Sequence, residues 1–579
     1  MAHEQHEGKG EVRIQGRGRY KVFLISLGLF LLALAPRLPG LGAFLTADEP
    51  KAWFGRSIQF LAALARADWA ATFDSPAPGV TTMWAGAIGL LLEYARQGFP
   101  GGSITTFLVD LPFDPLDPTI LPLVRFPIVL AAAIAAPLTY IWGRSFLGEK
   151  GAVLAAIFLA LDPFLLALSR VLGHDALVAI FMWLALLAFL QAYIPYLKSP
   201  RAGQTSTLKV DRRYLLVSGA LGGLAFLTKY PSLFLGAFVA GTMLALHISQ
   251  RESWRQALRD WMTDIVLWSV AAGLVFAVLW PAMWTDPIGR IMAIANDALR
   301  ASGSPHQKGS FFLGRPVPDP GPGFYPLVSL FRTTPLIWLG WILLIMAFWR
   351  LRWAKRQWKH VAPVLLAYVL LYGLLVTVGG KKQDRYIFPA FPALTTLAAL
   401  GYGEISNLQS RIFRLRWLLV LVVLAQAAFV LPHHPYYFTY YNPLMGGGAA
   451  AVRTMIVGWG EGLDQAARWL NTQPEAQNLD VVSWYSTTFE PFFHGHAIYK
   501  LEEEKISRSP KPGLAAEYVV FYINQVQREL PSSGGLQFFR ARPLLHTVTL
   551  HGIDYAWIYP SVGMQHVIAD EVRLVGQAE

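Results

Sequence analysis

Residues 175–196 read DALVAIFMWLALLAFLQAYIPY, and their one charged side chain, Asp175, stands at the first position. A run of about 20 apolar residues is long enough to cross the roughly 30 Å hydrocarbon core of a membrane as a helix. Ten further apolar runs precede residue 433, at 20–36, 121–142, 151–168, 214–228, 231–248, 262–284, 335–349, 361–378, 386–401 and 417–432. The sequence therefore predicts an all-α polytopic membrane domain of about 11 transmembrane helices.

The composition of the whole chain agrees with a membrane protein. Of its 579 residues, 54% are hydrophobic and 15% are charged, none is cysteine, and the mean hydropathy is +0.39. Soluble domains carry about 25% charged residues. These values exclude a disordered protein, a disulfide scaffold and cysteine-ligated metal chemistry, and they argue against an ordinary soluble enzyme.

The net charge of +12 is explained by the loops between the apolar runs. If Val80–Ala95 lies along the membrane surface, the connecting segments on one side hold 23 Lys and Arg in 85 residues, and the opposite loop 36–120 holds five in 85. Basic loops mark the cytoplasmic side. We therefore expect a cytoplasmic N-terminal tail (1–21), a long outer loop (36–120) with interfacial helices, and no role for nucleic acid.

The composition changes after the last apolar run. Residues 433–579 carry 10 basic and 14 acidic side chains. A helical pattern at Gly462–Leu470 is followed by four strand-like pieces. They are Asp480–Tyr485, Tyr518–Ile523, Leu544–Thr549 and Tyr555–Tyr559. We predict that a small extracytoplasmic α/β domain follows a membrane domain at 22–432.

Several charged side chains remain at the outer ends of the predicted spans. They are Asp48, Glu49, Arg125, Arg170, His174, Asp175, Lys229, Lys381, Lys382, Asp384 and Arg385. Charges at membrane depth are costly and usually face a cavity or a partner, although each alone could mark a helix end or snorkel to the interface. As a group, these cations beside carboxylates favour a shared anionic ligand at the outer face.

This pattern suits displacement at a phosphate-activated carbon. A carboxylate would take the proton from an acceptor hydroxyl, and fixed cations would stabilise the leaving phosphate. Arginine suits bidentate phosphate contacts, whereas lysine acts as a point charge.

Four motifs resemble those of the polytopic GT-C glycosyltransferases. They are TADEPKAW at 46–53, SRVLGHD at 169–175, TKYP at 228–231 and QDRYIFP at 383–389. The nearest branch is the protein O-mannosyltransferase-like group, with the aminoarabinose-to-lipid-A transferases as relatives, and the resemblance spans about residues 20–430. It implies inverting transfer of a sugar, mannose by default, from a polyprenyl-phosphate donor to an extracytoplasmic hydroxyl of a protein, lipid or glycan.

The resemblance also implies roles for particular residues. Asp48 matches the general base, Glu49 would support it or contact the acceptor, and Asp175 matches a second acidic position. The candidates for the donor phosphate are Arg125, Lys229, Arg385 and Lys382, and Arg170 and His174 are candidates for substrate contact. No metal ligand is expected and no cofactor is required as far as the sequence shows, although a divalent cation stays open.

Two departures from the family pattern bear on the acceptor. Residues 77–79 read Ala-Pro-Gly where relatives often show His-Pro or Lys-Pro, and the loop 285–334 is too short for the β-trefoil of eukaryotic members. The first departure removes any ligand role for a His at that position. The short loop favours a multi-pass enzyme of the prokaryotic plasma membrane and puts protein Ser or Thr as the acceptor in question. The alternatives are a transporter or flippase for a lipid-linked or anionic solute, and a structural assembly subunit.

The sequence leaves open the roles of two loops. His306 and Lys308 lie in a loop that could form a lid or simply be solvated. Gly458–Gly462 could touch a substrate or could form a turn before a helix.

Overall fold

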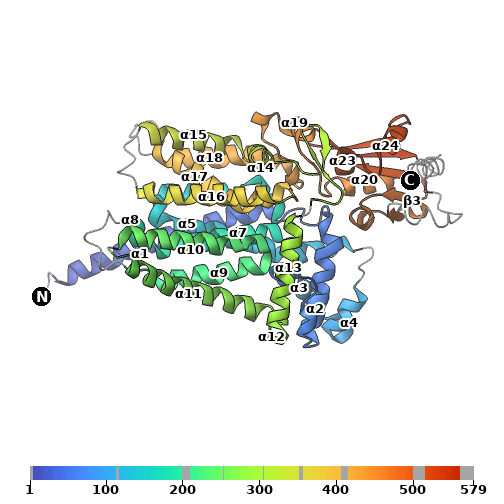
Figure 1. The fold of residues 1–579 in the computed structure, drawn as a ribbon. Coiled ribbons are helices and arrows are strands. Elements are labelled where there is room, and N and C mark those ends of the chain that lie inside the picture. Colours follow the sequence, from blue (N-terminus) through green and yellow to red (C-terminus); the bar gives the residue numbers. More distant parts are fainter. Residues whose placement is uncertain are drawn as a thin grey trace.

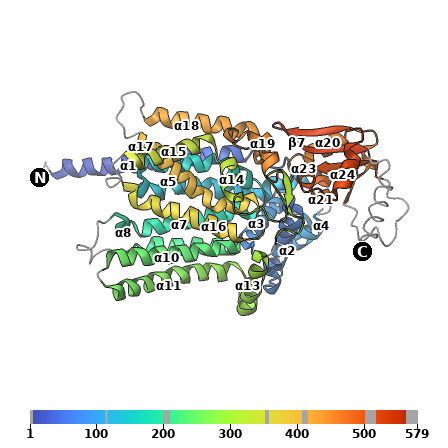
Figure 2. The same cartoon turned by 45° about the horizontal axis from the view of Figure 1, so that its top comes forward.

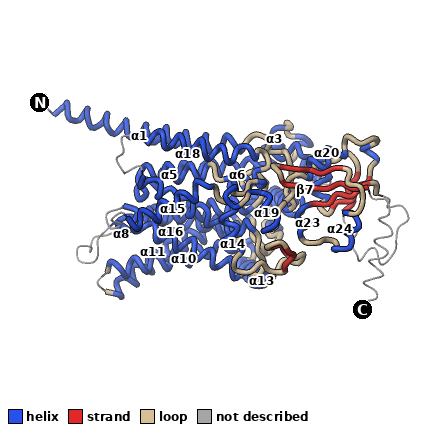
Figure 3. Tube along the Cα trace, turned by 90° about the horizontal axis from the view of Figure 1, so that it is seen from above, coloured by secondary structure: helices blue, strands red, loops and turns tan. Residues whose placement is uncertain are grey.

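The structure, a computed structural model, describes residues 4–111, 116–198, 209–251, 253–303, 305–350, 357–405, 415–499 and 516–560. Long helices form a bundle, and a smaller part built on a β-sheet lies at one end of it (Figure 1). Figure 3 shows that the strands gather at that end, with a short hairpin nearby. Residues 1–3 of the predicted N-terminal tail and residues 500–515 and 561–579 of the predicted C-terminal domain lie outside the described residues.

Every predicted apolar run is largely helical. The bundle contains α1 (Glu4–Leu34), α5 (Leu121–Ala160), α6 (Pro163–Leu168), α7 (His174–Ala192), α8 (Ile194–Lys198), α9 (Arg212–Thr228), α10 (Leu233–Gln250), α11 (Trp254–Leu279), α14 (Phe324–Arg332), α15 (Pro335–Arg350), α16 (Val361–Val378), α17 (Phe391–Ile405) and α18 (Leu415–Val430). The mostly helical class with a small C-terminal sheet is thus confirmed.

The number of spans stays a prediction. In the described part of the chain, six helices are long and apolar enough to cross a membrane, or seven if α14 and α15, bent by 111°, count as one span. Two predicted spans run together in α5, where Gly148 breaks the helical geometry with a φ of 75°. Helices α9, α17 and α18 are not among the six because they have only 17, 15 and 16 residues. The molecule is a multi-pass membrane protein.

The core of the bundle lies around α7. This helix is apolar on every face, and 89% of its apolar stretch is buried, whereas the value for α11 is 17%. A helix that is hydrophobic all round belongs in an interior. Figure 2 shows α11 at the edge of the bundle. Close packing between α9 and α11 depends on small residues, since a Cβ on Gly219 would lie 2.4 Å from the carbonyl oxygen of Trp268.

Several helices run across the end of the bundle that faces the sheet (Figure 1). They are α2 (Phe54–Ala65), α3 (Val80–Arg96), α4 (Ile104–Asp110), α12 (Ala282–Thr285) and α13 (Pro287–Gly303). Helix α3 is the segment that the charge pattern placed along the membrane surface. The N-terminal end of α1 lies at the opposite end of the bundle (Figure 1), and which end faces the cytoplasm stays a prediction.

The C-terminal part is a five-stranded sheet with short helices. Its strands are β3 (Asp480–Ser483), β4 (His496–Tyr499), β5 (Tyr518–Tyr522), β6 (His546–Leu550) and β7 (Ile553–Pro560), in the order β4-β3-β5-β7-β6. Strand β3 is parallel to β4 and β5, and β7 is antiparallel to β5 and β6. The four predicted strands are present, and the short strand β4 was not predicted.

Short helices complete this part of the chain. They are α19 (Gly447–Thr454), α20 (Leu463–Leu470), α21 (Ser486–Phe489), α23 (Ile523–Gln527) and α24 (Ser533–Arg540). The predicted helix at Gly462–Leu470 corresponds to α20. The hairpin beside the sheet pairs β1 (Ser310–Phe312) with β2 (Arg315–Val317).

The glycine-rich segment 458–462 of the C-terminal part contacts residues 38–53 at the end of the bundle, which are called the turn after α1. The amide of Ala47 donates to the carbonyl of Trp459 at 2.7 Å. Gly460 has a φ of +137°, and a Cβ there would lie 2.1 Å from the carbonyl oxygen of Leu45, so only glycine fits. The turn after α1 is therefore held directly against the C-terminal part.

Candidate active site

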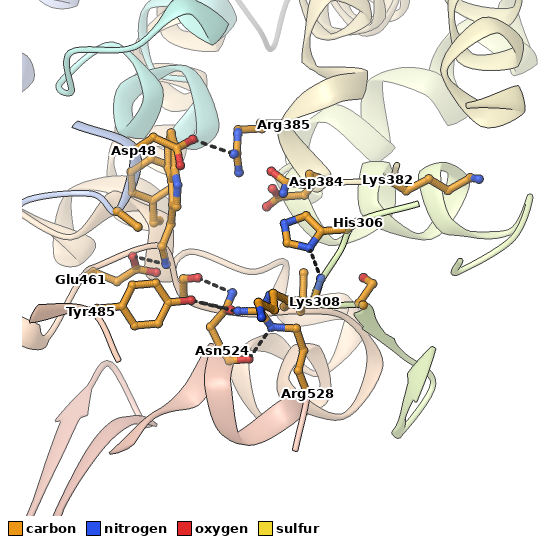
Figure 4. Close-up of a pocket in the computed structure, with 18 of the residues that line it drawn as sticks. Asp48, His306, Lys308, Lys382, Asp384, Arg385, Glu461, Tyr485, Asn524 and Arg528 are labelled. Carbon is orange, nitrogen blue, oxygen red and sulfur yellow. Dashed lines mark hydrogen bonds and ion pairs between the residues drawn. The ribbon is translucent and has the colours of Figure 1, made fainter. Parts of the chain in front are cut away.

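A cavity of about 300 Å³ lies between the end of the bundle and the sheet (Figure 4). Its walls come from the turn after α1, the β1 segment, the turn after α16 and loops of the C-terminal part. Its acidic and basic lining residues, His306 apart, are Asp48, Lys51, Lys308, Arg332, Lys382, Asp384, Arg385, Glu461 and Arg528. Six cations face three carboxylates, so the cavity suits an anionic ligand.

Asp48 reaches the cavity from the turn that follows α1. The next five residues, Glu49–Trp53, form a π-helical turn, a rare geometry that is frequent at functional sites. The Asp48 side chain is 42% exposed, and Oδ2 accepts a hydrogen bond from Nη2 of Arg385 at 2.9 Å. The carboxylate is therefore oriented and still accessible to a ligand.

Ion pairs behind Asp48 connect three of the other predicted site residues. Nε of Arg385 lies 3.2 Å from Oδ2 of Asp175, and Nζ of Lys229 donates to Oδ1 of Asp175 at 2.7 Å. Burial alone would lower the pKa of Arg385, but Asp48 and Asp175 more than offset it, and the pKa is raised. For Lys229, burial outweighs the attraction of Asp175 and lowers the pKa. The fold thus brings Asp48, Asp175, Lys229 and Arg385 together from four separate segments.

Glu49 and Arg125 form a buried ion pair outside the cavity lining. Their side chains are 0% and 1% exposed. Nε and Nη2 of Arg125 donate to the two Glu49 oxygens at 2.8 and 2.7 Å. Glu49 also accepts from the amides of Leu172 at 2.7 Å and Thr46 at 2.9 Å, and Arg125 donates to two carbonyls of the turn after α1. The pair fixes that turn to α5 and to the hairpin before α7.

Arg170 and His174 stabilise the same hairpin. Arg170 is buried and donates to the carbonyls of Arg37 and Gly40 at 2.8 and 2.9 Å. The ring of His174 packs edge-on against Trp53, with 4.8 Å between centroids. Neither side chain lines the cavity.

The turn after α16, residues 379–390, takes part in two more ion pairs, each between a cation and an aspartate. Nζ of Lys382 donates to Asp319 and to a backbone carbonyl, both at 2.8 Å. Arg332 of α14 donates to Asp384 at 2.6 Å, and its guanidinium lies 4.3 Å from the centroid of the Tyr441 ring. Arg332 was missed in the sequence, although it is a cation at the end of a mostly apolar helix, which is a recognisable signal.

The opposite wall belongs to the C-terminal part and was not predicted. In Figure 4, Tyr485, Asn524 and Arg528 face Asp48 and Arg385 across the cavity, with His306 and Lys308 between them. Oη of Tyr485 donates to Oδ1 of Asn524 at 2.9 Å, and Nη2 of Arg528 donates to Oη of Tyr485 at 3.0 Å. Trp459 and Glu461 also line the cavity, so segment 458–462 borders it.

The described residues contain no group of three or more His, Asp or Glu side chains that could hold a metal ion. The cavity offers a ligand carboxylates, lysines, arginines, aromatic rings and the side-chain amides of Gln383 and Asn524.

Taken together, the bundle, the cavity at its end and the sheet that covers it define a multi-pass membrane protein with a cation-rich polar site outside the helix core. Residues 122–284, well under half of the chain, match the model of the family described as dolichyl-phosphate-mannose-protein mannosyltransferase. The match confirms the predicted resemblance to GT-C glycosyltransferases of the protein O-mannosyltransferase type. A search of curated proteins gave no match.

Three solved structures are similar to this chain at low identity. ArnT from Cupriavidus metallidurans bound to undecaprenyl phosphate is 13% identical, with a TM-score of 0.45 over 93% of this chain and 97% of that one. The oligosaccharyltransferase of Archaeoglobus fulgidus is 12% identical, with a TM-score of 0.44 over 89% and 71%. The S. cerevisiae protein O-mannosyltransferase Pmt1-Pmt2 complex bound to the sugar donor is 18% identical, with a TM-score of 0.33 over 47% and 34%.

Proposed function

We propose that the protein is an inverting glycosyltransferase that moves a sugar, mannose in the first instance, from a polyprenyl phosphate to an extracytoplasmic hydroxyl acceptor. The observation that carries this proposal is the accessible Asp48 carboxylate, oriented by Arg385 in a cavity with an excess of cations. The family matched by residues 122–284 is named for a dolichyl-phosphate-mannose donor, which supports the donor class.

The proposed reaction is a single displacement at the anomeric carbon. Asp48 takes the proton of the acceptor hydroxyl while its oxygen forms a bond to that carbon. The bond between the anomeric carbon and the phosphate oxygen breaks on the opposite face, and the polyprenyl phosphate leaves with the electron pair. Arg385 and Lys382 line the cavity and would stabilise the charge that develops on this phosphate.

The remaining predicted residues are proposed as positioning residues. Asp175 pairs with Arg385, and Lys229 pairs with Asp175. The ion pair between Glu49 and Arg125 fixes the turn that carries Asp48. This proposal revises the sequence-based roles of Arg125 and Lys229, because both side chains have carboxylate partners and lie outside the cavity lining.

The test is donor consumption by the purified, full-length protein. The protein is incubated with polyprenyl-phosphate mannose, glucose or galactose and a membrane extract as the source of acceptors, and released polyprenyl phosphate is measured. We expect release with at least one donor. Folded protein that releases none with any donor would contradict the proposal, and movement of an intact donor across a vesicle membrane would instead support the transporter alternative.

We expect Lys229→Ala to raise the KM for polyprenyl-phosphate mannose about tenfold and to change kcat less. Removal of the ammonium group leaves Arg385 and His174 as the partners of Asp175 in the described residues, and the guanidinium is drawn away from the cavity. A hydrogen bond to a charged group is worth about this factor. Initial rates at varied donor concentration measure the effect. Lys209→Ala is the control, since Lys209 is an exposed lysine three residues before α9. An unchanged KM in Lys229→Ala would refute the role.

A further inference from the structure

The carboxyl ends of strands β3 and β5 open toward the cavity. These strands are parallel neighbours at the centre of the sheet. The chain leaves β3 toward β4 on one side and leaves β5 toward β6 and β7 on the other. In open α/β sheets, ligands bind in the crevice outside the strand ends at the point where neighbouring connections diverge in this way.

The side chains that follow these two strands meet in that crevice. Tyr485 comes two residues after the end of β3, and Asn524 comes two residues after the end of β5. Their side chains are hydrogen-bonded at 2.9 Å, and Arg528, just after α23, bonds to both. The sheet topology therefore places a phenol, an amide and a guanidinium on the cavity wall opposite Asp48 (Figure 4).

The six cations of the cavity fall into two groups of three. Arg332, Lys382 and Arg385 each pair with an aspartate. In contrast, the structure shows no ion pair to a carboxylate in the described residues for Lys51, Lys308 or Arg528. The ammonium group of Lys51 instead lies over the rings of Tyr485 and Tyr499, 5.7 and 5.5 Å from their centroids.

Asp48 acts on Lys51 without forming an ion pair with it. Burial lowers the pKa of Lys51, with Asp48 acting against it and Arg528 adding to it. Burial also lowers the pKa of His306 to about 4, so its ring is neutral near pH 7 and adds no charge. Two lysines and an arginine beside aromatic rings are the groups that would bind an acidic group attached to a sugar.

We propose that the crevice formed by Lys51, Lys308, Tyr485, Asn524 and Arg528, the strand-end crevice, is the acceptor subsite and takes a glycan that carries an acidic group, either a phosphate or a carboxylate. This proposal rests on the proposed function for the identity of the other substrate. The donor phosphate is attached to a lipid chain, so it belongs on the bundle side with Arg385. The strand-end crevice is then left for the acceptor.

The experiment is a titration of the purified full-length protein, without donor, by ligand-observed NMR. The probes are glucose 6-phosphate, glucuronic acid and glucose. We expect both acidic probes to bind at least about tenfold more tightly than glucose, and more weakly at high salt. Tighter binding of glucose 6-phosphate identifies a phosphate as the acidic group, and tighter binding of glucuronic acid identifies a carboxylate.

Variants assign the binding to the strand-end crevice. Arg528→Gln and Lys308→Gln should each weaken the acidic probes about tenfold and leave glucose unchanged, whereas Arg528→Lys should retain most of the affinity. Arg540→Gln, an exposed arginine on α24, is the control, and thermal unfolding verifies that each variant is folded.

Two outcomes would overturn the proposal: glucose binding as tightly as the acidic probes, or folded Arg528→Gln and Lys308→Gln proteins that keep the wild-type affinity. Because the titration contains no donor, either outcome leaves polyprenyl phosphate release as an independent measurement. Conversely, a protein that consumes no lipid-linked sugar would still show whether the crevice binds acids.

Discussion

Asp48→Asn is expected to lower the rate of sugar transfer by about 10²- to 10⁴-fold, the usual contribution of a general base. The substitution keeps the size of the side chain and its ability to accept a hydrogen bond from Arg385, but an amide cannot take the acceptor proton. Because the Asp48 side chain is 42% exposed, the stability of the fold should hardly change. Donor binding should also persist, because the asparagine keeps the size of the side chain and its contact with Arg385.

The measurement is polyprenyl phosphate release at saturating donor, together with donor binding and thermal unfolding of the same protein. Asp68→Asn is the matched control, since Asp68 is an exposed carboxylate in the same connecting segment, 36–120. A rate in Asp48→Asn close to that of Asp68→Asn would remove Asp48 from the role of base.

Glu49→Gln should be the most destabilising of the substitutions considered. It leaves the Arg125 guanidinium, which is 1% exposed, without its carboxylate partner. Removing one member of a buried ion pair costs about 3–5 kcal/mol, because the other charge stays buried and uncompensated. Transfer should fall as well, since the turn that carries Asp48 loses its attachment to α5.

The midpoint of thermal unfolding of the purified protein measures this effect. Glu149→Gln is the control, because Glu149 pairs with Lys21 at 49% exposure, where a pair is worth about 0–1 kcal/mol. The double variant Glu49→Gln/Arg125→Met should recover part of the loss, since it no longer buries a lone charge. Equal midpoints for Glu49→Gln and Glu149→Gln would contradict the interpretation.

The helices could be predicted because membrane spans are a local signal. The length and polarity of a run such as 175–196 are set by the hydrocarbon core, whatever its neighbours are. The carboxylates of Asp48 and Glu49 were also recognisable in the sequence, but the sequence did not show that they have different environments. One points into a cavity and the other is buried against Arg125, and adjacent positions in a turn do not determine which is which.

The far wall of the cavity could not be predicted in the same way. Tyr485 and Asn524 lie 39 residues apart in the sequence and become neighbours only because β3 and β5 pair. A polar residue after a short strand is an ordinary loop residue until the strand order is known. His306 and Lys308 could not be assigned to the cavity wall either, because the sequence is compatible with both a lid and a solvated loop at these positions.

The close fit of Gly460 against the turn after α1 has a consequence for how accurately the site is built. That turn is fixed on one side by a buried ion pair and on the other by main-chain contact with residues 459 and 460. A reacting group works best when its support leaves it little freedom. The carboxylate that has to be placed most accurately stands on a piece of backbone that is fixed from two sides. Adaptation to a different substrate would then fall to the opposite wall, where side chains can change without disturbing Asp48.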